Sequence, residues 1–161
     1  MLSPDPTSKR FPSKPPRLDS VFAKYEWPLW FITFNTFGRR HLLACQSVHE
    51  AFLAYAKRGC DLGTVEVGRY VLMPDHVHLF VRGGASLDLG MWIRGLKRAM
   101  SKTISTDSEV WQPGFFDHLL RNDESYEQKW EYVRLNPVRK GLVNTTDEWP
   151  YAGEVVRIDR P

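Results

Sequence analysis

Hydrophobic and polar positions along the chain follow strand-like spacing in some stretches and helix-like spacing in others. The stretch Leu29–Thr36 (LWFITFNT) is apolar and rich in aromatic and β-branched residues, which predicts a central β-strand. Two further strands are predicted at Thr64–Met73 and His76–Arg82, joined by a tight turn at Pro74-Asp75. A short fourth strand is expected around His118–Arg121.

Helical spacing separates these strands. Ser47 followed by Glu50 has the spacing of a capping box, so a helix is predicted from Val48 to about Arg58. A second helix is expected after Ser86, and a third from about Asp123 to Leu135. The order of elements favours an α+β fold of the ferredoxin-like (palm/RRM-like) type, with an antiparallel sheet and helices packed on one face.

Composition indicates one globular domain. The chain has 161 residues, of which 42% are hydrophobic and 25% charged. Residues 1–20 are rich in proline and carry several cations, which predicts a flexible Pro-rich basic arm before a single domain at 21–161. The apolar runs are too short for a membrane span, and no signal peptide is visible, so the expected location is cytoplasmic.

The strand His76–Arg82 contains the first candidate site. Alternate side chains of a strand share a face, so Val77 and Leu79 are expected to point into the core. His76 and His78 then share the opposite face, where two imidazoles can converge on one divalent metal ion. Two histidines on the wet face of a strand are more often plain polar surface, and spacing alone leaves both readings open.

The third predicted helix separates two tyrosines. Tyr126, Trp130 and Val133 form an i, i+4, i+7 stripe, which is the natural core face. Tyr132 and Asn136 are four residues apart on a different face. Tyr132 is therefore free to face a site, although an ordinary half-buried tyrosine fits the same spacing.

Cations gather in the second predicted helix. Four of them, with no acidic residue between them, define a basic face: Arg94, Lys97, Arg98 and Lys102. Such a face is usually just solvated, but it also suits a phosphodiester backbone. Arg39 and Arg40, directly after the first strand, are further candidates for phosphate contacts.

The segment Phe115–His118 has two interpretations. Its phenylalanines fit a packing role, while Asp117 could orient an imidazole and His118 could be a third one. The glycine-rich phosphate loop, the GxSxG elbow, the HExxH motif and the dinucleotide-binding glycine pattern are all missing from the sequence. This argues against the commonest nucleotide-dependent, hydrolase and metalloprotease designs, so no nucleotide cofactor is expected.

Two segments carry a resemblance to a known family. MPDHVHLFV resembles the histidine–hydrophobe–histidine (HUH) strand of single-tyrosine insertion-sequence transposases. WQPGFFDHLLRNDESYEQKWEYVRLNPVRKGLV resembles the C-terminal signature of the branch called REP-associated tyrosine transposases. The resemblance extends from about Trp27 to Ala152.

The resemblance implies a metal-dependent enzyme that cleaves and rejoins single-stranded DNA through a 5′-phosphotyrosine link. His76 and His78 match the metal ligands, Asn136 a further ligand, and Tyr132 the nucleophile. Asp75 matches a position beside the histidines that is often acidic or an amide. The implied cofactor is Mg²⁺ or Mn²⁺, and the implied partner is single-stranded or hairpin DNA, bound by a monomer or a homodimer.

Other functions compatible with this pattern remain. A domesticated DNA-binding protein of the same fold would bind without cutting. A replication initiator or relaxase shares the histidine strand but is usually larger than this chain. An RNA-binding ferredoxin-like module would be expected to carry an aromatic RNP strand, which the sequence lacks.

Overall fold

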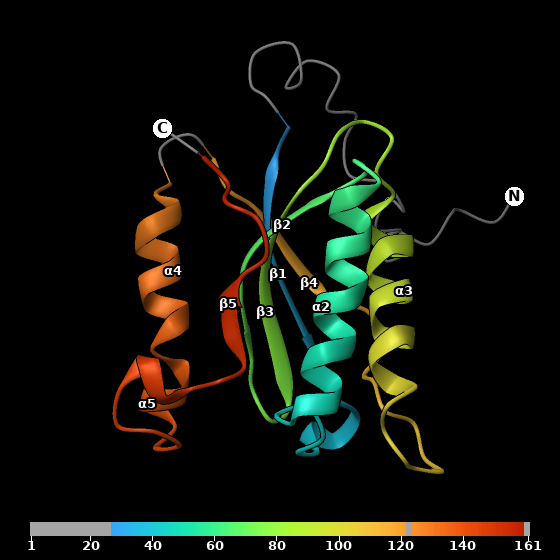
Figure 1. Ribbon diagram of the computed structural model, residues 1–161, viewed down its shortest axis with the longest axis vertical. Helices are drawn as coiled ribbons and strands as arrows, with labels where there is room; N and C mark the ends of the chain where they lie inside the picture. The colour runs from blue at the N-terminus through green and yellow to red at the C-terminus, as the bar shows by residue number, and fades with distance from the viewer. Residues whose placement is uncertain (1–26, 122–123, 160–161) are drawn as a thin grey trace, which may run out of the picture.

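The structure is a computed structural model that describes residues 27–121 and 124–159. The predicted basic arm, residues 1–20, lies outside the described residues. The elements follow one another as β1 (Leu29–Asn35), the 3-10 turn η1 (Phe37–Arg39), α2 (Gln46–Asp61), β2 (Glu66–Leu72), β3 (His76–Arg82), α3 (Leu89–Ser101), β4 (Phe116–Leu119), α4 (Tyr126–Arg134), α5 (Asn136–Arg139), the 3-10 turn η2 (Thr146–Glu148) and β5 (Ala152–Glu154) (Figure 1).

The strands form a five-stranded sheet in the order β4-β1-β3-β2-β5. Every pairing between neighbours is antiparallel. The split βαβ arrangement places β3 between β1 and β2, which confirms the predicted ferredoxin-like α+β fold. Strand β5 was not predicted; it extends the sheet beyond β2, next to Trp149, whose Nε1 donates to the Leu72 carbonyl.

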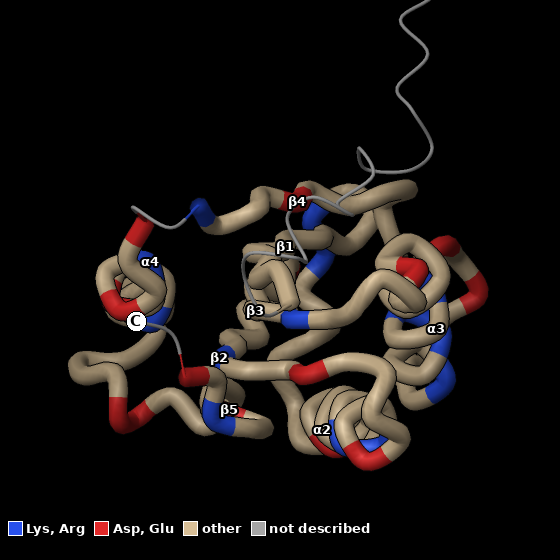
Figure 2. The backbone as a smooth tube through the Cα atoms, turned by 90° about the horizontal axis from the view of Figure 1, so that it is seen from above, with Lys and Arg blue, Asp and Glu red and all other residues tan. Residues whose placement is uncertain are grey.

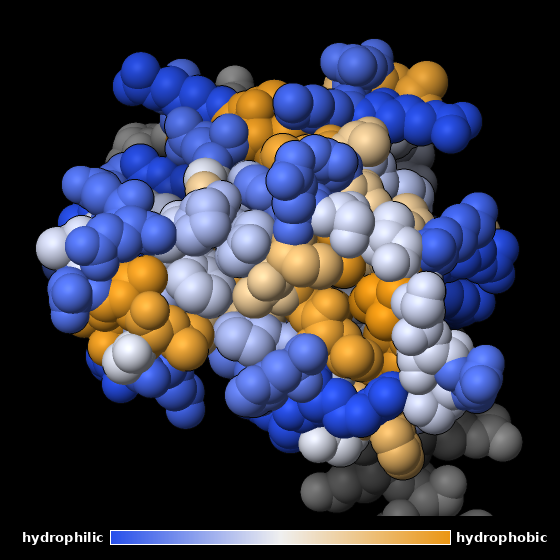
Figure 3. Space-filling model, turned by 60° about the horizontal axis from the view of Figure 1, so that its bottom comes forward, coloured by the Kyte–Doolittle hydropathy of each residue, from blue (hydrophilic) through white to orange (hydrophobic). Residues whose placement is uncertain are grey.

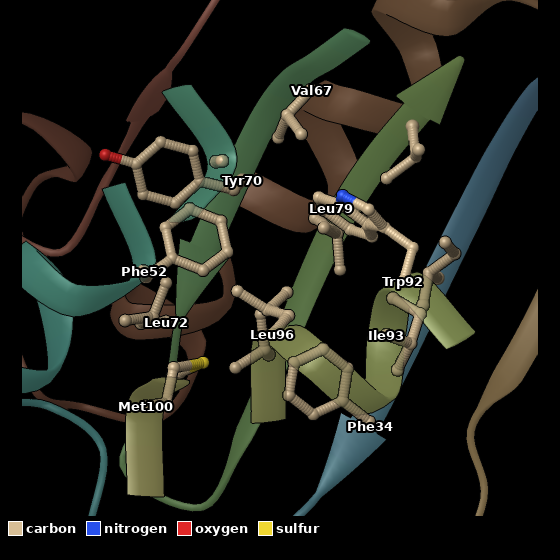
Figure 4. Close-up of a cluster of buried hydrophobic side chains, with 14 of the residues drawn as sticks. Phe34, Phe52, Val67, Tyr70, Leu72, Leu79, Trp92, Ile93, Leu96 and Met100 are labelled. Carbon is tan, nitrogen blue, oxygen red and sulfur yellow. The ribbon is translucent and has the colours of Figure 1, made fainter. Parts of the chain in front are cut away.

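Helices α2 and α3 cover one face of the sheet (Figure 1). The fully buried side chains there come from both layers, with Phe52 of α2 and Leu96 of α3 meeting Phe34 and Leu79 of the strands (Figure 4). This is the larger core of the domain. Burying such side chains stabilises the fold by about 1.5–3 kcal/mol each.

Helix α4 packs on the opposite face, which differs from the expectation that all helices share one face (Figure 2). Tyr126 and Val133 of α4 are buried against Phe31 and Phe80 of the sheet, and Trp130 packs at the edge of this cluster. The predicted core stripe of this helix is confirmed. The second core exists because β1 and β3 carry apolar residues on both faces, as strands covered on both sides do.

The starts and N-terminal caps of the helices differ from those that the sequence predicted. Helix α2 begins at Gln46 without a side-chain cap, so the expected capping box at Ser47 does not form. Helix α3 is capped by Asp88, which accepts from the Met91 backbone, and not by Ser86. Helix α4 is capped by Ser125, whose hydroxyl accepts from the Gln128 backbone. No helix in the described part of the chain is long and apolar enough to cross a membrane.

Candidate active site

The two histidines of β3 lie side by side on the face of the sheet that α4 packs against. His76 pairs in register with Asn35 and His78 with Thr33 of β1. Val77 and Leu79, which alternate with the histidines along β3, are buried in the core on the other face of the sheet, as strand alternation predicted. His76 is only 7% exposed, and His78 is half-buried, so neither is plain polar surface.

The imidazoles converge through their Nε2 atoms, which are 3.1 Å apart. The other ring nitrogens are held from behind: Nδ1 of His76 lies 2.7 Å from Asp75 Oδ1, and Nδ1 of His78 lies 2.7 Å from Thr33 Oγ1. The Asp75 carboxylate accepts a hydrogen bond from the Nδ1–H of His76, which leaves a free lone pair on its Nε2. The hydrogen bonds at Nδ1 thus orient both rings so that their Nε2 atoms point toward one place.

This arrangement fits a shared divalent metal ion. Metal–nitrogen bonds of about 2.1 Å at a right angle place two donor atoms about 3 Å apart. Partners that fix the tautomer of a ligating imidazole are a regular feature of metal sites. The described residues contain no group of three His, Cys, Asp or Glu suited to a metal, so a third protein ligand would have to be of another type.

Electrostatics keeps both rings unprotonated. Burial lowers the pKa of His78 to about 3, and the positive charges of Lys129, Arg139 and Arg39 act in the same direction. Burial also lowers the pKa of His76, although Asp75 opposes this. Burial by itself would raise the pKa of Asp75, but its hydrogen bond with His76 and the charge of Arg39 outweigh that effect and lower it. Neutral imidazoles beside an ionised carboxylate are the protonation states that metal binding requires.

Arg39 joins the end of β1 to this cluster. Its Nε donates to Asp75 Oδ2 at 2.9 Å, and its NH1 group donates to Asn35 Oδ1 at 2.7 Å. The residue adopts a left-handed backbone with φ 56°, directly after Gly38 at φ 63°. A non-glycine residue in this region costs about 1 kcal/mol or more, so the surrounding contacts must hold it there. Arg39 was predicted as a phosphate contact; its guanidinium pairs with Asp75, and its side chain stays half exposed beside the histidine pair.

Tyr132 and Asn136 lie where α4 gives way to α5. Tyr132 is 66% exposed, and the guanidinium of Arg139 lies 4.2 Å from the centre of its ring. Arg139 also donates to Asn136 Oδ1 at 2.8 Å. Helix α4 ends at Arg134, so the predicted pair belongs to two successive helices and not to one. Figure 3 shows this end of the molecule, where hydrophobic and hydrophilic side chains both reach the surface.

Lys129 connects helix α4 to the histidine pair. Its Nζ lies 4.8 Å from the centre of the Phe31 ring, and Phe31 in turn stacks on His78 at 5.4 Å. In the described part of the chain, the contacts of Tyr132 and Asn136 run to Arg139 and not to the imidazoles. The structure therefore brings the histidine pair and the Tyr132–Asn136–Arg139 group to the same face of the sheet without a direct contact between them.

The accessory candidates lie apart from the pair. Nε2 of His118 is hydrogen-bonded to the carboxylate of Glu124 at 2.8 Å. Asp117 is exposed and pairs in register with Ile32, whose side chain belongs to the opposite core. The hypotheses of a third imidazole at His118 and of an orienting carboxylate at Asp117 find no support in this geometry. Strand alternation turns Asp117 to the opposite face of the sheet, and His118, although on the histidine face opposite Phe31, is engaged by Glu124.

The predicted basic face is divided by the fold. Arg94 and Arg98 of α3 and Lys102, which caps its C-terminus, are exposed. Helix α3 lies on the side of the sheet away from α4 (Figure 2). Lys97 is only 9% exposed, so its prediction as a surface phosphate contact is wrong.

The physical reason is that Lys97 serves the interior. Its Nζ donates to the Gln112 and Gly114 carbonyls, at 3.2 and 2.6 Å, and lies against the rings of Phe34 and Trp111. Arg40, the remaining candidate, is turned toward the loop before β4, where it donates to Ser108 Oγ and the Glu109 carbonyl.

Sequence reasoning missed Thr33, Lys129 and the role of Arg139. Thr33 could have been found from strand pairing, because a polar residue on an otherwise apolar strand indicates a contact across the sheet. Lys129 lies one helical turn before Tyr132, so the helical spacing already placed it beside the tyrosine. No signal in the sequence separated Arg139 from the other cations near the C-terminus.

The chain is similar to known proteins in both sequence and fold. Residues 31–135, more than half of the chain, match the family described as transposase IS200 like. A REP-associated tyrosine transposase of Escherichia coli (strain K12) is 27% identical over 124 residues, covering 76% of this chain and 74% of the relative. A solved structure of a REP-associated tyrosine transposase bound to a REP hairpin superimposes with a TM-score of 0.65 at 26% identity, covering 80% of this chain and 77% of that one.

These matches confirm the resemblance seen in the sequence, and they span both the histidine strand and helix α4. The matched region also contains β2, β3 and β4, and all of β1 except its first two residues. The chain belongs to the IS200-like transposase family.

Proposed function

We propose that this protein cleaves and rejoins single-stranded DNA through a covalent link between Tyr132 and a 5′ phosphate. The observation that carries the proposal is the convergence of two neutral imidazoles at 3.1 Å, on the sheet face that α4 packs against. Tyr132 is the exposed tyrosine of that helix, while Tyr126 is buried and accepts a hydrogen bond from the Arg69 backbone. Family membership supports the same chemistry.

A divalent metal ion is the cofactor that this donor set would hold. His76 and His78 would bind it through Nε2, and the Asn136 amide oxygen is our candidate for a further ligand, released from Arg139. When bound, such an ion polarises the scissile phosphate and neutralises charge in the transition state. Imidazole suits Mn²⁺ better than Mg²⁺, which prefers oxygen ligands, so activity is expected to be higher with Mn²⁺.

The covalent step needs no nucleotide cofactor, because one phosphorus–oxygen bond is exchanged for another. The Tyr132 hydroxyl releases its proton to solvent, and its oxygen attacks phosphorus in line with the departing 3′ oxygen. A phosphorus–oxygen bond to tyrosine forms, the bond from phosphorus to the 3′ oxygen breaks, and the 3′ oxygen takes up a proton. Because the energy of the phosphodiester is kept in the phosphotyrosine, the 3′ hydroxyl of another strand can reverse the step and rejoin DNA.

The substrate we propose is single-stranded DNA that folds into a hairpin. A related transposase has been solved with a REP hairpin bound. On this chain, Lys129, Arg139 and Arg39 surround the histidine pair closely enough to depress the pKa of His78. These cations, more than those of α3, are placed to meet phosphates at the site.

The test is a denaturing-gel assay for a protein–DNA adduct. Labelled single strands from both flanks of the gene are incubated with Mn²⁺ and wild type, Tyr132→Phe or Tyr126→Phe. We expect a protease-sensitive, metal-dependent adduct with wild type and Tyr126→Phe, and none with Tyr132→Phe. An adduct that persists in Tyr132→Phe would refute the assignment of the nucleophile. Tight binding of single strands by wild type with no adduct would favour the domesticated DNA-binding protein.

A further inference from the structure

Phe116 is an aromatic side chain that the core does not use. It is 59% exposed and opens β4, which is an edge strand of the sheet. Its neighbour Phe115 is partly buried and packs against the larger core. A large apolar ring exposed on an edge strand invites unwanted association, so its presence there calls for an explanation by function.

The register of the sheet places Phe116 in line with the histidine site. Phe116 lies opposite Thr33 on β1, and Thr33 lies opposite His78 on β3. Directly opposite residues share a face, so the three side chains form one row across the sheet on the face that α4 packs against. With strands about 4.8 Å apart, Phe116 lies about 10 Å from His78 along this row. Thr33 bridges the row by its hydrogen bond to His78 Nδ1.

Hydrogen bonds to the preceding loop anchor the segment that carries Phe116. The loop before β4 is tied down by the buried amine of Lys97, which donates to the Gln112 and Gly114 carbonyls. Trp111 in the same loop donates from Nε1 to the Lys97 carbonyl. The exposed ring is thus presented by an anchored segment, which lowers the entropic cost of binding a ligand on it.

We propose that Phe116 is a stacking platform for a nucleobase of the single strand whose phosphate reaches the histidine pair; this inference rests on the proposed function. The cations Lys129, Arg139 and Arg39 draw the phosphate backbone to the site, and the ring of Phe116 receives a base from the adjoining nucleotides. Stacking on an aromatic ring tolerates any base, because every base has a flat face. Phe116 therefore adds affinity and positions the strand without reading its sequence.

The test measures binding without cleavage. A fluorescein-labelled DNA hairpin with a single-stranded oligothymidylate tail, and the same hairpin with abasic residues in place of the thymidines of its tail, are titrated with the full-length Tyr132→Phe protein and anisotropy is recorded. Into this background we introduce Phe116→Ala, Phe116→Leu or Phe116→Trp. The matched control is Leu62→Ala, an equally exposed apolar residue (67%) that caps α2 on the other side of the sheet.

We expect Phe116→Ala and Phe116→Leu each to weaken binding of the oligothymidylate tail about 5- to 150-fold, the loss of one base–aromatic stack. Phe116→Trp should retain binding, Leu62→Ala should change nothing, and none of the variants should alter the weaker binding of the hairpin with the abasic tail. Unchanged binding of the oligothymidylate-tailed hairpin by Phe116→Leu, or an equal loss on both hairpins, would overturn the platform. If the parent protein bound neither hairpin, the hairpin substrate of the proposed function would fall, and the platform with it.

Discussion

Acid should destabilise the metal-free protein, and His78 should account for a measurable part of the loss. Burial, reinforced by nearby cations, lowers the pKa of His78 from 6.5 to about 3. Between these two values the unfolded chain binds a proton at this residue and the native chain does not. The free energy of unfolding therefore falls as pH drops below 6.5, and it is fully retained above that pH.

The magnitude follows from the window. One pH unit corresponds to about 1.4 kcal/mol for each proton taken up only by the unfolded chain. Lowering the pH from about 6.5 to about 5 should thus cost about 2 kcal/mol through His78. Urea unfolding followed by tryptophan fluorescence, in EDTA at several pH values, measures this loss.

The variant His78→Gln isolates the contribution. Glutamine does not titrate and retains an amide near Thr33, so the variant should lose about 2 kcal/mol less than wild type over the same pH interval. His41→Gln, at an exposed histidine, controls for removal of a histidine as such. Equal pH dependence of wild type and His78→Gln would refute the claim that the buried ring stays neutral in the native chain.

Three further outcomes are expected. At a free Mn²⁺ concentration one hundred times its Kd, wild type should gain about 2.7 kcal/mol of stability. Thr33→Val removes the contact to His78 Nδ1 and should raise the Kd for Mn²⁺ about 10- to 100-fold, measured by calorimetric titration. An unchanged Kd would contradict the supporting role of Thr33. Tyr126→Phe should lower the free energy of unfolding by about 1–3 kcal/mol, because the Arg69 backbone amide loses its acceptor; urea unfolding checks this, and no loss would show that the amide finds another partner. Lys97→Met should cost a similar amount, about 1–3 kcal/mol, by leaving two carbonyls unpaired, and should speed amide hydrogen exchange in the loop before β4; exchange as slow as in wild type would refute the anchoring role.

The pattern along the chain predicted most of the fold. The strands β1 and β3 were found within one residue of their ends, because dense apolar and β-branched residues leave few alternatives. Helical spacing separated Tyr126 from Tyr132 correctly, since that separation depends only on the period of the helix. Helix starts were less predictable, because several polar residues near each one could serve as a cap and packing chose among them.

The candidate site divides in the same way. The sequence by itself determined that His76 and His78 share one face of a strand and that Tyr132 is turned away from the core, since the period of a strand or helix is local. Only the tertiary structure decided what surrounds them. Thr33 reaches His78 from 45 residues away, because strand register, not sequence distance, chooses the partners.

Lys97 also shows what local sequence pattern cannot predict. Its spacing among Arg94, Arg98 and Lys102 indicated a surface cation, yet two carbonyls of a loop that follows the helix draw it into the interior. A basic side chain is stable there because those carbonyls and the neighbouring rings replace its water. Local periodicity specifies which face a residue occupies; the segments that cover that face are brought there by the packing of the whole chain.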